Sequence, residues 1–156
     1  TTISLTQPSV LTSTVSSPTV IGGYNISCNG FTNGSISLNI NGGTSAYGYS
    51  WNGPSGYTTT VQNPSALAAG LYNVVITDIN GCTTTNSINL TQPASLNISL
   101  NSPTYAGGYN ITCSGYNNGA IYLTNGGGTP TYTYSWSGPL SYTSTSQNPS
   151  GLIAGT

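Results

Sequence analysis

The only charged side chain in this protein stands four residues before a cysteine. Both residues, Asp78 and Cys82, lie in the stretch TDINGC at residues 77–82, and the 156 residues contain no Lys, Arg, His or Glu. A carboxylate close to a thiol suits a redox site, a metal site or a catalytic site, and it equally suits a turn that leads into a structural cross-link. Each of the first three chemistries needs partner residues, so the rest of the composition decides among them.

The composition lacks the residues that most catalytic and binding chemistries use. General acid–base catalysis uses His, Lys or paired carboxylates, and nucleic-acid binding uses Lys and Arg to neutralise phosphates. Zinc sites need clustered Cys and His, calcium sites need several carboxylates, and no apolar run approaches the ~20 residues of a membrane-spanning helix. We therefore expect no enzyme activity, no cofactor, no metal, no nucleic-acid partner and no membrane insertion of this segment.

The stretch at residues 78–81 has the composition of a hairpin turn. An Asp that opens a turn accepts backbone N–H bonds, and the following Asn80-Gly81 pair suits positions with positive φ. The alternative is a calcium ligand at the end of a repeat, with Asn80 and backbone carbonyls completing the shell. We favour the turn, because a second carboxylate is missing.

The chain repeats itself without a gap, with a period of about 85 residues. GGYNISCNG from Gly22 returns as GGYNITCSG from Gly107, and YGYSWNGP from Tyr47 returns as YTYSWSGP from Tyr132. We assign residues 1–8 to the tail of a preceding repeat, 9–93 to a complete repeat, and 94–156 to a second repeat truncated before its last two strands. We expect the chain to be part of a longer tandem array.

Short β-branched or aromatic runs bounded by Gly, Pro and Asn predict about seven strands in each repeat. Tyr72, Val74 and Ile76 alternate with residues of the opposite face, as in a strand with one buried side. The composition and spacing predict an all-β fold of tandem immunoglobulin-like antiparallel β-sandwich repeats of about 85 residues. The expected strands of the complete repeat are 10–15, 24–28, 35–40, 47–51, 57–61, 71–77 and 83–90.

Four motifs in one order resemble those of tandem SprB repeats. They are C-x-G-x-x-N-G-S from Cys28, GGT-x-x-Y-x-YSW from Gly42, L-x-x-G-x-Y-x-V-x-I-T-D-x-N-G-C from Leu67, and TQP at each junction. Repeats of this family occur in very large cell-surface adhesins of gliding Bacteroidota that the type IX secretion system exports. The resemblance implies an immunoglobulin-like module, an extracellular location at the cell surface and a role in a surface filament. The near-absence of charge departs from the family.

An extracellular setting permits disulfides. We predict a structural disulfide between Cys28 and Cys82 within the complete repeat, and Cys113 would pair with a cysteine beyond the chain end. Closing a loop of about 54 residues would stabilise the repeat by about 4 kcal/mol in the chain-entropy model. A reactive or redox-active thiol is the alternative, but the chain offers no base or cation that would lower a thiol pKa.

The aromatic run Tyr47, Tyr49 and Trp51 lies on one strand face. We predict that it packs in the core, as a central-strand Trp does in sandwich folds; a sugar-stacking platform is the alternative. Tyr57 and Tyr142 follow Gly- or Ser-rich turns, so we expect them to be exposed and name them as possible surface contacts between modules or filaments. Glycosylation is a further alternative. Five sequons fit the Asn-x-Ser/Thr pattern of glycan acceptors, namely Asn25, Asn33, Asn89, Asn97 and Asn110.

Three functions follow from these observations. The first is a structural segment of a long surface filament or adhesin, a stalk or fibre in adhesion and gliding motility, with neighbouring repeats and lateral copies as partners. The second is a carbohydrate-binding module for surface glycans, which exposed aromatics in a groove would favour. The third is a self-assembling sheath or surface-layer subunit, which ordered lateral contacts would favour.

Overall fold

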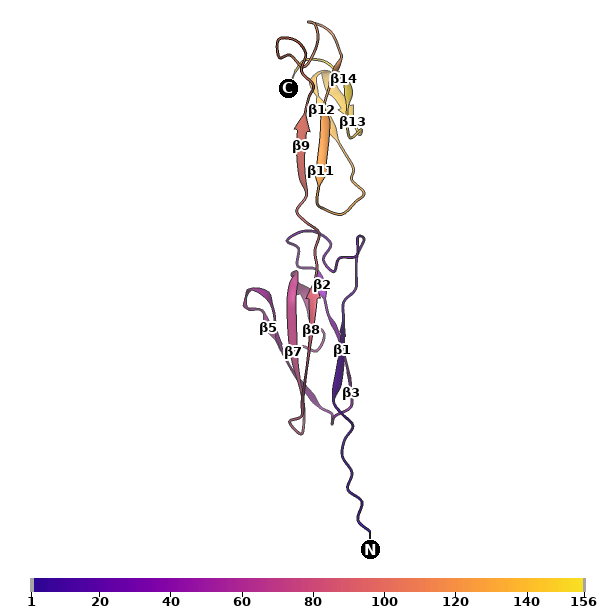
Figure 1. The fold of residues 1–156 in the computed structure, drawn as a ribbon, viewed down its shortest axis with the longest axis vertical. Coiled ribbons are helices and arrows are strands. Elements are labelled where there is room, and N and C mark those ends of the chain that lie inside the picture. The colour runs from indigo at the N-terminus through magenta and orange to yellow at the C-terminus, as the bar shows by residue number, and fades with distance from the viewer. Residues whose placement is uncertain (1, 156) are drawn as a thin grey trace. The chain divides into compact units, whose positions relative to one another are not determined.

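The computed structural model describes residues 2–155 and contains strands and two short 3₁₀ turns. The chain divides into two compact units, the first ending at Pro93 and the second beginning at Ala94 (Figure 1). Every strand pair is antiparallel, so the fold is all-β. Within residues 2–155 no helix has the length and hydropathy that spanning a bilayer requires.

The first unit is built on one four-stranded sheet of order β5-β4-β7-β8 and two two-stranded sheets, β1-β3 and β2-β6 (Figure 1). Its strands are β1 (Thr12–Ser16), β2 (Gly34–Ser35), β3 (Ser37–Asn41), β4 (Tyr47–Asn52), β5 (Thr58–Thr59), β6 (Ser65–Leu67), β7 (Gly70–Asp78) and β8 (Thr83–Leu90). A 3₁₀ turn, Pro54–Gly56, joins β4 to β5.

Strand β7 lies at the centre of the large sheet, paired with β4 on one side and β8 on the other. Its side chains alternate as predicted, because Tyr72, Val74 and Ile76 are buried whereas Leu71 and Val75 are exposed. Apolar side chains on one face of the pleat reach the core, and the opposite face meets solvent. This strand therefore supplies much of the core of the first unit.

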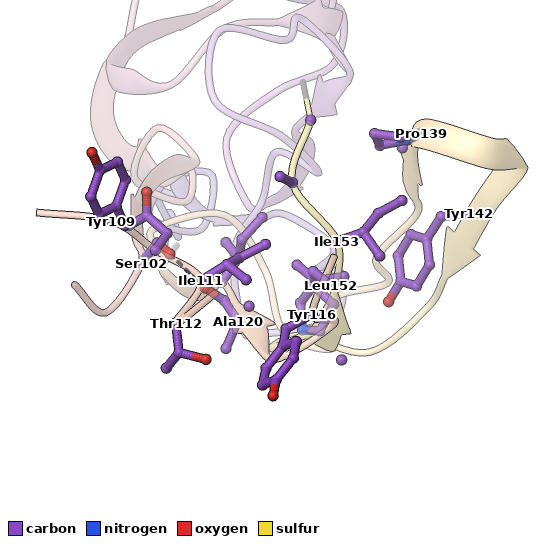
Figure 2. A pocket seen from close by; sticks show the side chains of 18 of the residues that line it. Ser102, Tyr109, Ile111, Thr112, Tyr116, Ala120, Pro139, Tyr142, Leu152 and Ile153 are labelled. Atoms are coloured by element: carbon purple, nitrogen blue, oxygen red, sulfur yellow. Dashed lines mark hydrogen bonds between the residues drawn. The ribbon is translucent and has the colours of Figure 1, made fainter. Parts of the chain in front are cut away.

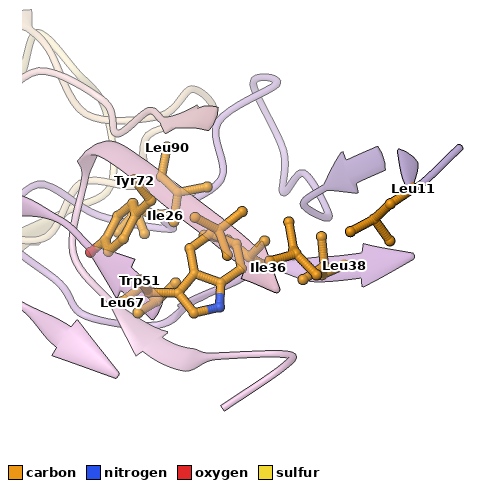
Figure 3. Close-up of a cluster of buried hydrophobic side chains, with 10 residues drawn as sticks. Leu11, Ile26, Ile36, Leu38, Trp51, Leu67, Tyr72 and Leu90 are labelled. Atoms are coloured by element: carbon orange, nitrogen blue, oxygen red, sulfur yellow. The ribbon is translucent and has the colours of Figure 1, made fainter. Parts of the chain in front are cut away.

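The core of the first unit collects apolar side chains from all three sheets and from the loop before β2 (Figure 3). Its largest members are Trp51 on β4 and Tyr72 on β7, both 1% exposed. Large aromatics dominate burial energetics because of their contact area. The buried apolar set is Leu11, Ile26, Ile36, Leu38, Trp51, Leu67, Tyr72, Val74, Ile76 and Leu90.

One predicted strand needs correction, and one observed strand was not predicted. Residues 24–28 form no strand: residues 25–28 are bends, and the N–H groups of Asn25 and Ile26 both donate to the carbonyl oxygen of Thr91 at 3.0 Å. These shared bonds tie the segment to a single residue instead of pairing it residue by residue with a neighbouring strand. Conversely, β6 was not predicted; its three residues follow Pro64 and pair with β2.

The second unit contains counterparts of the first six strands. They are β9 (Asn97–Asn101), β10 (Gly119–Ala120), β11 (Tyr122–Gly126), β12 (Trp136–Gly138), β13 (Tyr142–Ser144) and β14 (Ser150–Leu152). Strand β12 has three residues where β4 has six. The reason is pairing: all six β4 residues pair with β7, and the residues described in the second unit include no counterpart of β7.

Candidate functional site

The Asp78 carboxylate closes the hairpin turn between β7 and β8. Its Oδ1 accepts the backbone N–H groups of Asn80 (2.9 Å) and Cys82 (2.8 Å), and the Gly81 N–H donates to the Asp78 carbonyl oxygen at 3.0 Å. Gly81 takes a φ of 82°, where a glycine is favoured. The predicted turn is confirmed, with Gly81 as the residue of the Asn-Gly pair that has positive φ.

The same carboxylate joins this turn to the loop between β3 and β4. Asp78 Oδ2 accepts the Thr44 N–H at 2.9 Å, and Asn80 Nδ2 donates to Thr44 Oγ1 at 3.0 Å. The backbone N–H groups of Thr44, Cys82 and Asn80 donate to the carboxylate. They hold the pKa of Asp78 below its ordinary value, with the Thr44 N–H contributing most, although burial opposes the shift. Asp78 is 4% exposed, and residues 2–155 contain no cluster of three potential metal-binding side chains. The carboxylate is therefore a structural anchor.

The disulfide expected between Cys28 and Cys82 is not formed in this structure, since all three cysteines are exposed free thiols. Cys82 lies in the turn before β8, whereas Cys28 lies beyond the other end of β8, two residues after Ile26, whose N–H bonds Thr91. The eight residues of β8 separate these positions by about 26 Å. Bonded cysteines need Cα atoms within about 7 Å. The expected partner of Cys113 lies outside the described residues.

The aromatic run of β4 belongs to the core, as predicted. Trp51 is 1% exposed and lies among Leu67, Tyr72 and Ile36 (Figure 3). Tyr47 is half-buried, and its hydroxyl donates to the Gly42 carbonyl oxygen at 2.7 Å. A buried indole presents no face on which a sugar ring could stack, so Trp51 does not form the sugar-stacking platform that was the alternative.

Tyr57 and Tyr142 were expected to be exposed, and the structure corrects this because both are half-buried. Tyr57 meets the Tyr72 ring edge-on, with ring centroids 5.4 Å apart and planes at 80°. The cause is the 3₁₀ turn, in which the Tyr57 N–H bonds the Pro54 carbonyl oxygen at 3.0 Å and returns the chain toward the core. Tyr142 lines a cavity of the second unit (Figure 2).

The loop at residues 25–30, called here the exit loop, holds the chain where it leaves β8. Besides the two N–H bonds to the Thr91 carbonyl oxygen, Asn25 Oδ1 accepts the Thr91 N–H (2.9 Å) and hydroxyl (3.1 Å). Asn25 Nδ2 donates to the Pro18 carbonyl oxygen at 3.3 Å. The side chain of this sequon is thus engaged in the fold, which leaves it poorly placed to carry a glycan.

The exit loop also binds the two residues that follow Thr91. The Gly30 N–H donates to Gln92 Oε1 at 2.9 Å, and Asn29 Nδ2 donates to the Pro93 carbonyl oxygen at 3.1 Å. Leu90 and Pro93 are buried. The TQP motif, which marks each repeat junction in the sequence, is therefore tied to its own unit. Residues 24–28, whose pattern suggested a strand, supply much of that binding.

In the second unit, the residues that correspond to the core of the first unit lie on an open surface. Leu96 is 58% exposed, whereas its counterpart Leu11 is 8% exposed. A cavity of 1260 Å³ runs along this surface, lined by apolar side chains that include Ile111, Trp136 and Leu152 (Figure 2). In the first unit β7 and β8 cover the equivalent residues.

Comparison with known proteins gives one family. A family model described as SprB repeat matches residues 24–56 and 109–141, two segments that begin at equivalent positions of the two repeats. The first match begins at Tyr24, directly before the exit loop, and the second begins at the equivalent Tyr109; each ends in a 3₁₀ turn. No curated protein and no solved structure matches the chain.

Proposed function

This chain belongs to the SprB repeat family, and we propose that it is a structural repeat segment of a long extracellular filament or adhesin at a cell surface. Its role there is that of a stalk or fibre in surface adhesion and gliding. Each complete repeat is an immunoglobulin-like sandwich, a proposal that the antiparallel sheets and the buried central Trp51 support.

The observation that carries the proposal is where the chain enters and leaves the first unit. At the entrance, the Ser9 carbonyl oxygen accepts the Gly43 N–H at 2.9 Å, beside Thr44 and the Asp78 turn. At the exit, Thr91 is bound to the exit loop. These ends lie about 26 Å apart, the length of the eight-residue β8. A unit entered at one end and left at the other adds length with every repeat.

The second unit begins in the same way. The Gly128 N–H donates to the Ala94 carbonyl oxygen at 2.8 Å, the counterpart of the bond at Ser9. The only charged side chain of the two units is buried in the Asp78 turn. These units therefore offer no charged surface for recognising substrates or nucleic acids. That property suits a spacer, and in this proposal other parts of a larger protein make the adhesive contacts.

Electron microscopy of intact cells tests the proposal. We expect gold-labelled antibodies against the purified chain to mark extended structures outside the cell without permeabilisation, at positions that project from the envelope. Labelling that requires permeabilisation would overturn the extracellular assignment. Labelling confined to a continuous ordered layer would replace the stalk with a sheath or surface layer, and saturable binding of the purified chain on a glycan array would favour a carbohydrate-binding module.

A further inference from the structure

One side chain of the exit loop connects the segment that follows the first strand to the segment that follows the last strand of the first unit. Asn25 Nδ2 donates to the Pro18 carbonyl oxygen at 3.3 Å, and Asn25 Oδ1 accepts the N–H and the hydroxyl of Thr91 at 2.9 and 3.1 Å. Pro18 follows β1 by two residues, and Thr91 directly follows β8. The Asn25 carboxamide therefore bridges two segments that lie near opposite ends of the repeat in sequence.

Strands β1 and β8 lie side by side and run in the same direction, from the entrance of the first unit to its exit. β1 begins three residues after Ser9, whose carbonyl oxygen is bound at the entrance, and β8 begins after the Asp78 turn at the same end. Within residues 2–155 these two strands share no backbone pairing. Side chains connect them instead, because Asn86 Nδ2 on β8 donates to the Ser13 carbonyl oxygen at 2.9 Å.

Tension along the chain loads the Asn25 side chain directly. A pull on the two ends of the unit draws β1 toward the entrance and Thr91 toward the exit, so the two segments slide past each other. The shortest connection between entrance and exit runs along β1 to Pro18, across the Asn25 carboxamide, and on to Thr91. The residues between Asn25 and Thr91 in sequence lie outside this connection, and Thr91 leaves the unit only after these bonds break.

Two further observations support a load-bearing role for the exit loop. Leu90 and Pro93, on either side of the loaded segment, are buried, so drawing out residues 90–93, the LTQP segment, also exposes apolar surface to water. The bond that begins the connection recurs in the second unit, where Asn110 Nδ2 donates to the Pro103 carbonyl oxygen at 3.1 Å. The arrangement therefore belongs to the repeat and not to one copy of it.

We propose that the exit loop is a latch that resists force, with Asn25 at its centre, and that its rupture limits the unfolding of the first unit under tension along the chain. Forced unfolding is governed by the unfolding rate, which depends on the contacts that break before the barrier is crossed. The inference rests on the proposed stalk function for the source of the tension. Its test uses the purified chain, so the latch and the cell-surface location can each fail without the other.

Single-molecule force spectroscopy with handles on tags at the two chain ends tests the latch. Unfolding of residues 9–93 is recognised by a length increase of roughly 27 nm. Asn25→Ala removes three side-chain bonds, and each hydrogen bond changes a rate by a factor of about 2–12, so we expect roughly tenfold or faster unfolding at constant force. The matched control, Asn73→Ala, removes one side-chain bond to Asn52 between β7 and β4, which backbone pairing already joins; its rate should stay within about threefold of the unmodified chain.

A second pulling direction separates a latch from a general loss of stability. In a Cys28→Ser, Cys113→Ser background, handles on the N-terminal tag and on the exposed Cys82 thiol apply tension between two points at the entrance. Thr91 lies outside this path, so Asn25→Ala should change the unfolding rate there by less than about threefold. Equal acceleration in the two directions would show that Asn25 acts on stability alone, and an unchanged rate in end-to-end pulling would show that the latch bears no load. Either result overturns the proposal.

A milder variant keeps the test decisive if Asn25→Ala does not fold. Thr91→Val removes only the hydroxyl bond to Asn25 Oδ1 and keeps the backbone bonds of an exposed residue. We expect unfolding to accelerate by a factor of about 2–12 in end-to-end pulling and to stay unchanged when the tension is applied through Cys82. A Thr91→Val chain with the unmodified unfolding rate in both directions would contradict the central place of Asn25 in the latch.

Discussion

Gly34 offers a steric test of the core of the first unit. It lies on β2, is buried, and does not take a positive φ, so its role is close packing. A Cβ at this position would lie 2.6 Å from Ile26 Cδ1 and 3.0 Å from both the Leu67 carbonyl oxygen and Leu90 Cδ1. Ile26 is 0% exposed, so its side chain cannot swing into solvent to make room, and the Leu67 carbonyl oxygen belongs to the backbone of a paired strand. Overpacking of this kind costs about 1–3 kcal/mol, and we expect Gly34→Ala to lower the free energy of unfolding by that amount.

The matched control is Gly48→Ala on the exposed face of β4, where an added Cβ meets nothing nearer than the Thr77 carbonyl oxygen at 3.9 Å. Replacing a strand Gly by Ala is ordinarily favourable by about 0.5–1 kcal/mol. Fluorescence of Trp51 in a Trp136→Phe background reports unfolding of the first unit in thermal and urea melts. For a domain of this size, 1 kcal/mol moves the Tm by about 4–8 °C. An unchanged Tm in Gly34→Ala, or equal losses in the two variants, would refute the packing argument.

Three further predictions concern the titratable groups. Amide donors lower the pKa of Asp78 in the folded state. The stability that this carboxylate contributes is therefore complete above its unfolded pKa of about 4 and is lost as pH falls through the lower folded pKa. The urea midpoint of the unmodified chain should decline in acid, and Asp78→Asn should abolish that decline. Burial, followed by the nearby Tyr57, raises the pKa of Tyr72. The stability that the neutral phenol contributes is therefore complete below its unfolded pKa of about 10 and is lost as pH rises toward the higher folded pKa. Tyr72→Phe should flatten this alkaline decline in the urea midpoint. Cys28, Cys82 and Cys113 are exposed, so a maleimide should label three thiols in the native chain, and a 2 Da loss in an oxidised monomer would contradict the free, separated thiols.

Local patterns predicted a good part of this fold. The two-residue alternation of β7 identified its buried face, because a pleated strand points successive side chains to opposite sides. The turn at residues 78–82 followed from Asp, Asn and Gly in an order that hairpins use. The placement of Trp51 followed from its size, since an indole on a central strand is best accommodated by burial.

The errors came from contacts between segments distant in sequence. Residues 24–28 have strand-like side chains, but their backbone donors bind one carbonyl oxygen across 66 positions of sequence. The pairing of Cys28 with Cys82 was predicted from the extracellular setting and from the presence of both cysteines in one repeat, whereas the direction of β8 places the two thiols at its opposite ends. Tyr57 was expected at the surface because of its polar neighbours, and the 3₁₀ turn places its ring against Tyr72.

The exit loop and the LTQP segment at residues 90–93 also constrain how a gene for such repeats can change. Asn25 and Thr91 are 66 residues apart, yet both lie within one period of the repeat. Recombination that adds or removes a whole period keeps every loop with its tetrapeptide, whereas an insertion or deletion of part of a period separates them. A change in repeat number therefore preserves these hydrogen bonds, whereas a change in repeat length breaks them.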